Sequence, residues 1–132
     1  MIVVADTSVF LDFLDEVIAD PFSLIRPCRT ILISPVALHE VLRTYPEEMH
    51  ARLTEELTQE LLPPPKLEHW IETARILRQL YPLRKEKNIA RMQNDVLICL
   101  SARDIRAPVW SRDSDFELIC NHLNVGLINL SS

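Results

Sequence analysis

Glycine is almost absent from this chain, which contains only Gly126 among its 132 residues. Phosphate-binding loops of the GxGxxG and GxxxxGK[ST] types need several glycines, because the backbone must approach the phosphate closely. The GxSxG turn that exposes the nucleophilic serine of α/β-hydrolases also needs more than one. The sequence therefore excludes nucleotide-binding loops of these kinds and hydrolases with that serine turn.

Cysteine and long apolar runs are scarce as well. The three cysteines, Cys28, Cys99 and Cys120, have no paired spacing, which favours reduced thiols and a cytoplasmic location. No apolar run approaches the roughly 20 residues that cross a bilayer, and the first residues lack the basic region of a signal peptide. We expect one domain, residues 1–132, without a membrane partner.

An excess of basic residues is also lacking. The chain has 19 acidic and 14 basic residues, for a net charge of −5. If four acidic residues surround a divalent metal ion, the remaining fifteen nearly balance the fourteen basic ones. An acidic total therefore does not exclude a phosphate-bearing substrate, but any basic track must be local.

Short apolar runs alternate with amphipathic segments along the chain. The apolar runs predict strands at 1–5, 30–34, 107–111 and 126–130. The amphipathic segments predict helices at 8–14, 36–43, 46–62, 66–81, 95–105 and 113–123. This alternation predicts an α/β fold with three layers, α/β/α, around a mostly parallel central sheet.

Several helix details are also predicted. Thr7 or Ser8 is expected to cap the first helix, and Pro35 suits a first helical turn. The segment 95–105 is apolar almost all round, so we expect a buried helix that Asp95 opens.

Apolar side chains of the segment 66–81 recur at helical spacing. Leu67, Ile71, Ala74 and Leu77 are expected to form its buried stripe. Trp70 and, further along the chain, Trp110 are expected in the core rather than on the surface as stacking platforms for RNA.

Five acidic residues stand where a parallel sheet gathers functional groups, just beyond the carboxyl ends of its strands. Asp6 follows the first predicted strand, and Asp113 and Asp115 follow the third. Glu40 lies on the helix after the second strand, and Asp95 opens the buried helix. Taken singly, each has an ordinary alternative role as a helix cap or a solvated side chain. As a set of hard oxygen donors they predict a site for Mg²⁺ or Mn²⁺.

The histidines do not suggest zinc. The segment HEVLR (39–43) begins like the zinc-protease motif HExxH, but its last position is Arg43. His50, His69 and His122 have no partner at ligand spacing.

Four segments together resemble the successive blocks of the PIN domain family, especially its VapC-type toxins. These segments are VVADTSVFLDFL, SPVALHEVLR, NDVLICLSAR and VWSRDSDFELI, in family order and over essentially the whole chain. The acidic residues that match the family are Asp6, Glu40, Asp95 and Asp113, with Asp115 as a possible fifth. Hydroxyl residues match at Thr7, Ser8 and Ser111.

The resemblance implies a metal-dependent endoribonuclease that a cognate antitoxin protein inhibits and that commonly forms a homodimer. It implies the catalytic residues Asp6, Glu40, Asp95 and Asp113. It also implies that Mg²⁺ or Mn²⁺ is held by Asp6, Asp95, Asp113 and Asp115. Glu40 would be a further ligand or the general base, and Thr7, Ser8 and Ser111 would orient carboxylates or water.

An RNA substrate also needs contacts to its backbone. The candidates are Arg84, Lys85, Lys87, Arg91 and Arg112, which stand near Asp95 or Asp113 in the sequence. The ordinary alternative for such a charged run is a solvated helix end.

Other functions compete with a toxin ribonuclease. A phosphatase or receiver domain would use Asp6 as a nucleophile. However, Ser8 replaces the second aspartate of the phosphatase motif, and no lysine follows the late strands. A PIN fold that only binds its partners and a stand-alone RNA-processing nuclease remain open. The helices predicted within 46–81 would carry a dimer interface or simply pack in the core.

Overall fold

The computed structural model describes residues 2–15, 30–81 and 89–128. In these residues a parallel sheet has the strand order β2-β1-β3-β4. Its strands are β1 (Ile2–Ala5), β2 (Thr30–Ile33), β3 (Val109–Trp110) and β4 (Leu127–Ile128). The four predicted strands and their parallel arrangement are confirmed.

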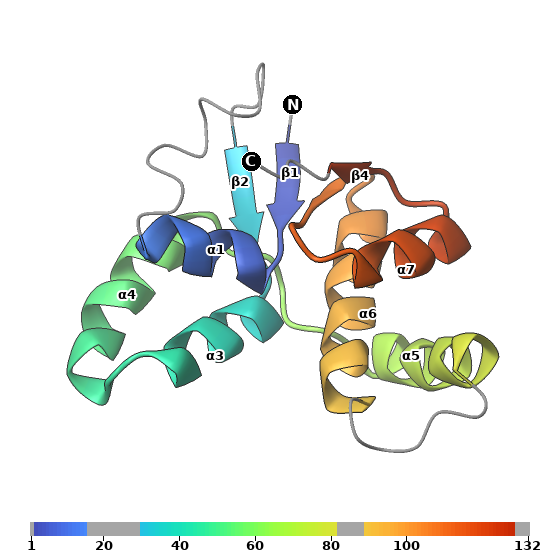
Figure 1. The fold of residues 1–132 in the computed structure, drawn as a ribbon, viewed down its shortest axis with the longest axis horizontal. Helices are drawn as coiled ribbons and strands as arrows, with labels where there is room; N and C mark the ends of the chain where they lie inside the picture. Colours follow the sequence, from blue (N-terminus) through green and yellow to red (C-terminus); the bar gives the residue numbers. More distant parts are fainter. Residues whose placement is uncertain (1, 16–29, 82–88, 129–132) are drawn as a thin grey trace.

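Helices connect these strands. The α-helices are α1 (Thr7–Leu14), α3 (Pro35–Thr44), α4 (His50–Leu57), α5 (Leu67–Leu80), α6 (Ile89–Asp104) and α7 (Asp115–Leu123). Two 3₁₀ turns, η1 (Glu47–Met49) and η2 (Thr58–Glu60), flank α4. Figure 1 shows the arrowheads of β1 and β2 pointing toward α1, α3 and α6.

Both faces of the sheet are covered by apolar side chains. On one face Val4 and Ile33 pack in a core that includes residues of α3, α5, α6 and α7. On the other face Val3, Ala5 and Trp110 pack with Val9 of α1. Successive side chains of a strand point to opposite faces, so an almost continuous apolar run such as IVVA serves both cores. The predicted three-layer α/β/α architecture is confirmed.

The starts of α1 and α3 follow different local signals. Pro35 occupies the first turn of α3 as predicted, and the Ser34 hydroxyl accepts the N–H of Val36 at 3.2 Å. The cap predicted for α1 was wrong, because Asp6 rather than Thr7 or Ser8 caps it. Asp6 has an extended backbone, and its Oδ1 accepts the N–H of Val9 at 3.3 Å.

The buried helix α6 begins earlier than predicted. It starts at Ile89, so Asp95 lies within the helix and does not open it. The polar residues Gln93 and Asn94 lie within the helix, where both are half-buried, and the residues that follow them from Asp95 to Ala102 are all buried. This difference matters for the site, since Asp95 is thereby fixed by helix on both sides.

The segment 46–62 is not one continuous helix. It forms η1, α4 and η2 instead. The regular helix ends because the chain then turns to run beside β2, where the N–H of Leu62 donates to the carbonyl of Ile33 at 2.9 Å.

Helix α5 buries a different face from the one predicted. Its buried residues include Thr73, Ile76 and Leu77, whereas Leu67 is 74% exposed and Ile71 is 63% exposed. The predicted stripe was therefore wrong except at Leu77. The regular spacing of leucine, isoleucine and alanine does not reveal which side of an amphipathic helix meets α6.

The two tryptophans also differ. Trp110 is fully buried, as predicted, whereas Trp70 is 44% exposed, so its assignment to the core was wrong.

Cys99 and Cys120 are buried free thiols whose sulfur atoms lie 3.6 Å apart. Within the described ranges, no helix combines the length and the apolar character needed to cross a membrane.

Candidate metal and catalytic site

Four predicted acidic residues line one cavity. They come from separate places in the fold: Asp6 between β1 and α1, Glu40 on α3, Asp95 on α6, and Asp113 after β3. The cavity has a volume of about 280 Å³ and is also lined by Thr7, Leu11, Arg43, Ala90, Arg91 and Asn94. Parallel strands that end at the same edge bring Asp6 and Asp113 together, and α3 and α6 add the other two.

Asp6 is buried and fully engaged by hydrogen bonds. Its Oδ1 accepts the Ser8 hydroxyl at 2.6 Å as well as the N–H of Val9, and its Oδ2 accepts the Ser111 hydroxyl at 2.7 Å. Burial raises the pKa of Asp6 to about 6, although these hydrogen bonds favour its charged form.

The two serines also tie Asp6 to the segment after β3. The Ser8 hydroxyl accepts the backbone N–H of Arg112 at 3.1 Å, and the Ser111 hydroxyl accepts the backbone N–H of Asp113 at 2.9 Å. The predicted hydroxyl residues therefore hold two chain segments in register beside the cavity.

Asp95 is buried with one unpartnered oxygen. Its Oδ2 has no hydrogen-bond partner. Burial, followed by the negative charges of Asp6, Asp113 and Glu40, raises the pKa of Asp95 to about 8. An unsatisfied buried carboxylate oxygen is costly in a folded protein, and a bound cation would supply the missing partner.

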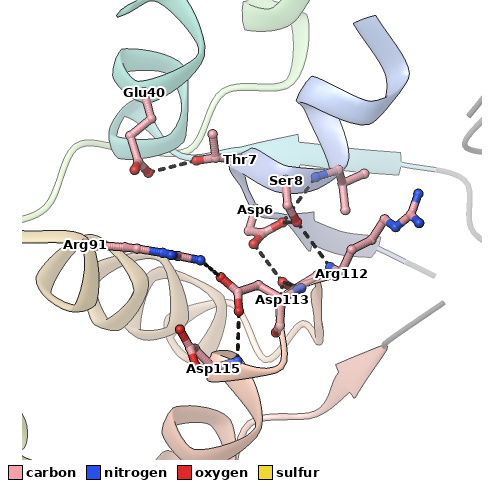
Figure 2. A network of polar contacts seen from close by, with 10 residues as sticks. Asp6, Thr7, Ser8, Glu40, Arg91, Arg112, Asp113 and Asp115 are labelled. Carbon is pink, nitrogen blue, oxygen red and sulfur yellow. Dashed lines mark hydrogen bonds and ion pairs between the residues drawn. The ribbon is translucent and has the colours of Figure 1, made fainter. Parts of the chain in front are cut away.

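Glu40 is held by the first residue of α1. The hydroxyl of Thr7 donates to its Oε1 at 2.8 Å. Figure 2 shows this contact together with the bonds that surround Asp6. Thr7, the residue after Asp6, thus orients a carboxylate that belongs to another helix.

Asp113 is engaged by a cation of the chain itself. Its Oδ2 forms an ion pair with Arg91, and its Oδ1 accepts the backbone N–H of Asp115 at 2.9 Å. In Figure 2, Asp113 lies between these two partners. Asp115 itself is exposed and does not line the cavity. The structure therefore brings four of the five acidic residues together, and Asp115 contributes its backbone N–H there.

The donor set fits a hard divalent cation. Among the described residues, no group of three or more His, Cys, Asp or Glu side chains is already arranged to hold a metal ion. Two of the four carboxylates already have a partner within the chain: Asp113 is paired with Arg91, and Glu40 accepts a hydrogen bond from Thr7. The four carboxylates at one cavity and the unpartnered oxygen of Asp95 nevertheless suit Mg²⁺ or Mn²⁺. The ligand roles of these residues stay predictions.

The structure separates the predicted RNA-contacting residues. Arg91 lines the cavity. Arg112 does not, because its Nη1 lies 2.9 Å from Oδ2 of Asp12 and its guanidinium points away from the acidic residues in Figure 2. The remaining candidates, Arg84, Lys85 and Lys87, lie outside the described residues.

Two polar residues of the cavity were not predicted from the sequence. Arg43 lies on α3 three positions after Glu40, and Asn94 adjoins Asp95 on α6. Helical spacing from Glu40 could have placed Arg43 on the same face. The sequence analysis treated Arg43 only as the residue that breaks a zinc motif.

Comparison with known proteins supports the same fold. The PIN domain family model matches residues 3–121. No curated protein sequence matches this chain. VapBC-1 from nontypeable Haemophilus influenzae is similar in structure, with a TM-score of 0.66, 20% identity, and coverage of 98% of this chain and 98% of that chain. VapBC2 from Rickettsia felis, bound to a DNA fragment from its promoter, is also similar in structure. Its TM-score is 0.66 at 19% identity, and the match covers 99% of this chain and 100% of that chain. At these identities the similarity shows a shared fold.

Proposed function

The chain belongs to the PIN domain family, and from this premise we propose that it is a Mg²⁺- or Mn²⁺-dependent endoribonuclease of the VapC toxin type. The observation that carries this proposal is the cavity lined by Asp6, Glu40, Asp95 and Asp113. The unpartnered oxygen of buried Asp95 makes a purely structural role for this acidic cluster costly.

Asp6, Asp95 and Asp113 would hold the cation. When bound, it lowers the pKa of coordinated water and offsets the negative charge of the scissile phosphate. Ser8 and Ser111 position Asp6 through the bonds described above. Asp115 supports Asp113 through its backbone N–H and is not needed as a ligand in this proposal.

Glu40 is the general base. The hydroxyl of Thr7 holds its Oε1 and leaves the carboxylate able to accept a proton from a water molecule. As that water attacks phosphorus, its oxygen forms the new P–O bond and its proton passes to Glu40. The bond to the leaving oxygen breaks, and that oxygen takes up a proton from solvent. Hydrolysis of an RNA phosphodiester results.

The phosphate backbone of RNA would be bound by cations beside the acidic residues. Arg43 and Arg91 line the cavity, so they are placed to contact phosphate oxygens. The sequence candidates Arg84, Lys85 and Lys87 belong to the same proposal. Arg112 is a weaker choice because Asp12 already neutralises it.

The proposal extends to partners. Both similar structures carry the name VapBC, and the sequence resembles the VapC toxins, so we include a cognate antitoxin protein. A second copy of the chain would form a homodimer. The exposed apolar residues Leu67, Trp70 and Ile71 of α5 are available for such a contact. The expected location is the cytoplasm.

An RNA cleavage assay tests the proposed activity. Labelled RNA should be cut in the presence of Mg²⁺ or Mn²⁺ and remain intact with EDTA. Glu40→Gln removes the proposed general base and should reduce cleavage at least about a hundredfold. Asp95→Asn removes a proposed metal ligand and should reduce cleavage by at least as much. Asp115→Asn is the matched control, because it retains the backbone N–H that Asp113 accepts, and it should retain cleavage. RNA that binds but is never cut would favour a binding module instead.

A further inference from the structure

The most informative contact at the site is the ion pair between Arg91 and Asp113. Asp113 is one of the three proposed metal ligands, and its Oδ2 is already occupied by the guanidinium of Arg91. Among the described residues, this contact is the one ion pair that reaches an acidic residue of the cavity. A cation supplied by the chain therefore stands where the metal would bind.

We propose that Arg91 is an internal competitor of the metal, so that the guanidinium must leave Asp113 before a divalent cation can bind. The inference rests on the proposed metal-dependent function. It adds a residue that sets the metal affinity of the site and keeps the resting site closed to weakly bound cations.

The geometry fixes the acid and leaves the arginine free to move away. Asp113 is held by the N–H of Asp115 on its side chain and by Ser111 on its backbone N–H. The side chain of Arg91 is 60% exposed, whereas that of Asp113 is 18% exposed. An ion pair with so exposed a partner is weak, so a divalent cation can displace it while the carboxylate stays in place.

The position of Arg91 on α6 directs it at the whole acidic cluster. It precedes Asp95 by four positions, which places both residues on one face of the helix, and both line the cavity. The charges of Asp113, Asp95 and Asp115 all favour the charged form of Arg91. A guanidinium and a divalent cation at the same oxygen would repel each other, so binding of one excludes the other.

Arg43 provides a matched control. It carries the same charge and lines the same cavity from α3. In the part of the chain that the structure describes, the ion pair to Asp113 comes from Arg91 and not from Arg43. Replacing either arginine by glutamine removes one positive charge from the cavity, but only Arg91→Gln removes the direct competitor.

Calorimetric titration of the whole chain with MnCl₂ tests the inference without any measurement of cleavage. Arg91→Gln should bind Mn²⁺ about five- to tenfold more tightly than the unsubstituted chain. Arg43→Gln should change the affinity less than about twofold, because the described ion pair to Asp113 comes from Arg91. Arg91→Lys, which retains the charge, should lie between Arg91→Gln and the unsubstituted chain. It also serves as the second variant if Arg91→Gln does not fold.

The outcomes separate this inference from the proposed function. If Mn²⁺ binds the unsubstituted chain but the two glutamine variants gain affinity equally, the effect is general electrostatics and the competitor role is wrong. If Arg91→Gln binds Mn²⁺ more weakly, Arg91 supports the metal and the inference is again overturned. If neither the unsubstituted chain nor any of the variants binds Mn²⁺, both the inference and the metal-dependent function are overturned.

Discussion

The hydroxyl of Ser111 donates a hydrogen bond of 2.7 Å to Oδ2 of Asp6, although 105 positions separate the two residues in the chain. The same oxygen of Ser111 accepts the backbone N–H of Asp113 at 2.9 Å. One fully buried side chain therefore connects the end of β1 with the segment after β3. The relative position of two proposed metal ligands depends on it.

Replacing this hydroxyl should destabilise the protein. Ser111→Ala leaves Oδ2 of Asp6 and the N–H of Asp113 without their shared partner, so we expect a loss of about 1–2 kcal/mol in the free energy of unfolding. Urea denaturation at pH 8, where Asp6 is ionised, measures the loss. Ser114→Ala is the control, because the Ser114 side chain makes no capping hydrogen bond, and it should change stability by less than about 0.5 kcal/mol. Equal losses in the two variants would contradict the assigned role.

Without metal, the protein should become less stable as pH rises. The pKa values of Asp6 and Asp95 are raised from 3.8 to about 6 and about 8, so the folded state retains protons that the unfolded chain releases. The stability that these two protonated carboxyl groups contribute is fully present below about pH 4 and is lost as pH rises toward 8. For Asp6 alone the shift corresponds to about 3 kcal/mol.

Asp95→Asn isolates one part of this pH dependence. The amide stays neutral, so the variant should lose about 3–4 kcal/mol less than the unsubstituted chain between pH 5 and pH 8. Urea unfolding in EDTA at the two pH values gives both differences. Parallel pH profiles for the two proteins would show that Asp95 does not titrate as its burial predicts.

Added Mg²⁺ or Mn²⁺ should raise the melting temperature more at pH 8 than at pH 5. At pH 5 Asp6 and Asp95 are largely protonated in the folded protein, and ligands must lose their protons before they bind a metal ion. Thermal unfolding at millimolar metal, with EDTA as the reference, measures the increments. Asp95→Asn should abolish most of the increment at pH 8. An increment that is the same at both pH values would argue against these carboxylates as ligands.

Two isoleucines on α5 test which face of the helix is buried. Ile76 is 2% exposed and Ile71 is 63% exposed. Ile76→Ala should cost about 2–4 kcal/mol through lost burial and a cavity, whereas Ile71→Ala should cost less than about 0.5 kcal/mol. Urea denaturation of the two variants provides the comparison, and a reversed order would restore the face predicted from the sequence.

The positions of the strands and four of the five acidic residues near the cavity could be predicted because their signals are local. Apolar runs such as IVVA determine buried strands, and parallel strands place Asp6 and Asp113 at one edge. Helix boundaries were less predictable. The start of α6 at Ile89 differs from the predicted start at Asp95. The cap at Asp6 is a local contact to the N–H of Val9, but three neighbouring residues, Asp6, Thr7 and Ser8, can all cap a helix and the sequence does not distinguish them.

The details of the site depended on packing between distant segments. Asp113 and Asp115 are both aspartates and only two positions apart, yet only Asp113 lines the cavity. Helix α7 begins at Asp115, whose backbone N–H donates to Oδ1 of Asp113. Likewise, Arg91 and Arg112 were equivalent candidates, and their different ion pairs separated them.

The sequence by itself determined the α/β architecture, the acidic residues that are candidates for a hard cation, and the exclusion of glycine-dependent phosphate loops. These follow from hydrophobic patterning and from the chemistry of individual side chains. Both can be recognised within a short segment, without knowing what the segment packs against. Only the tertiary structure decided that Arg91 occupies Asp113 and that Asp95 retains an unpartnered oxygen. Such contacts arise when α6 packs against the sheet, and their energies depend on burial and distance rather than on residue type.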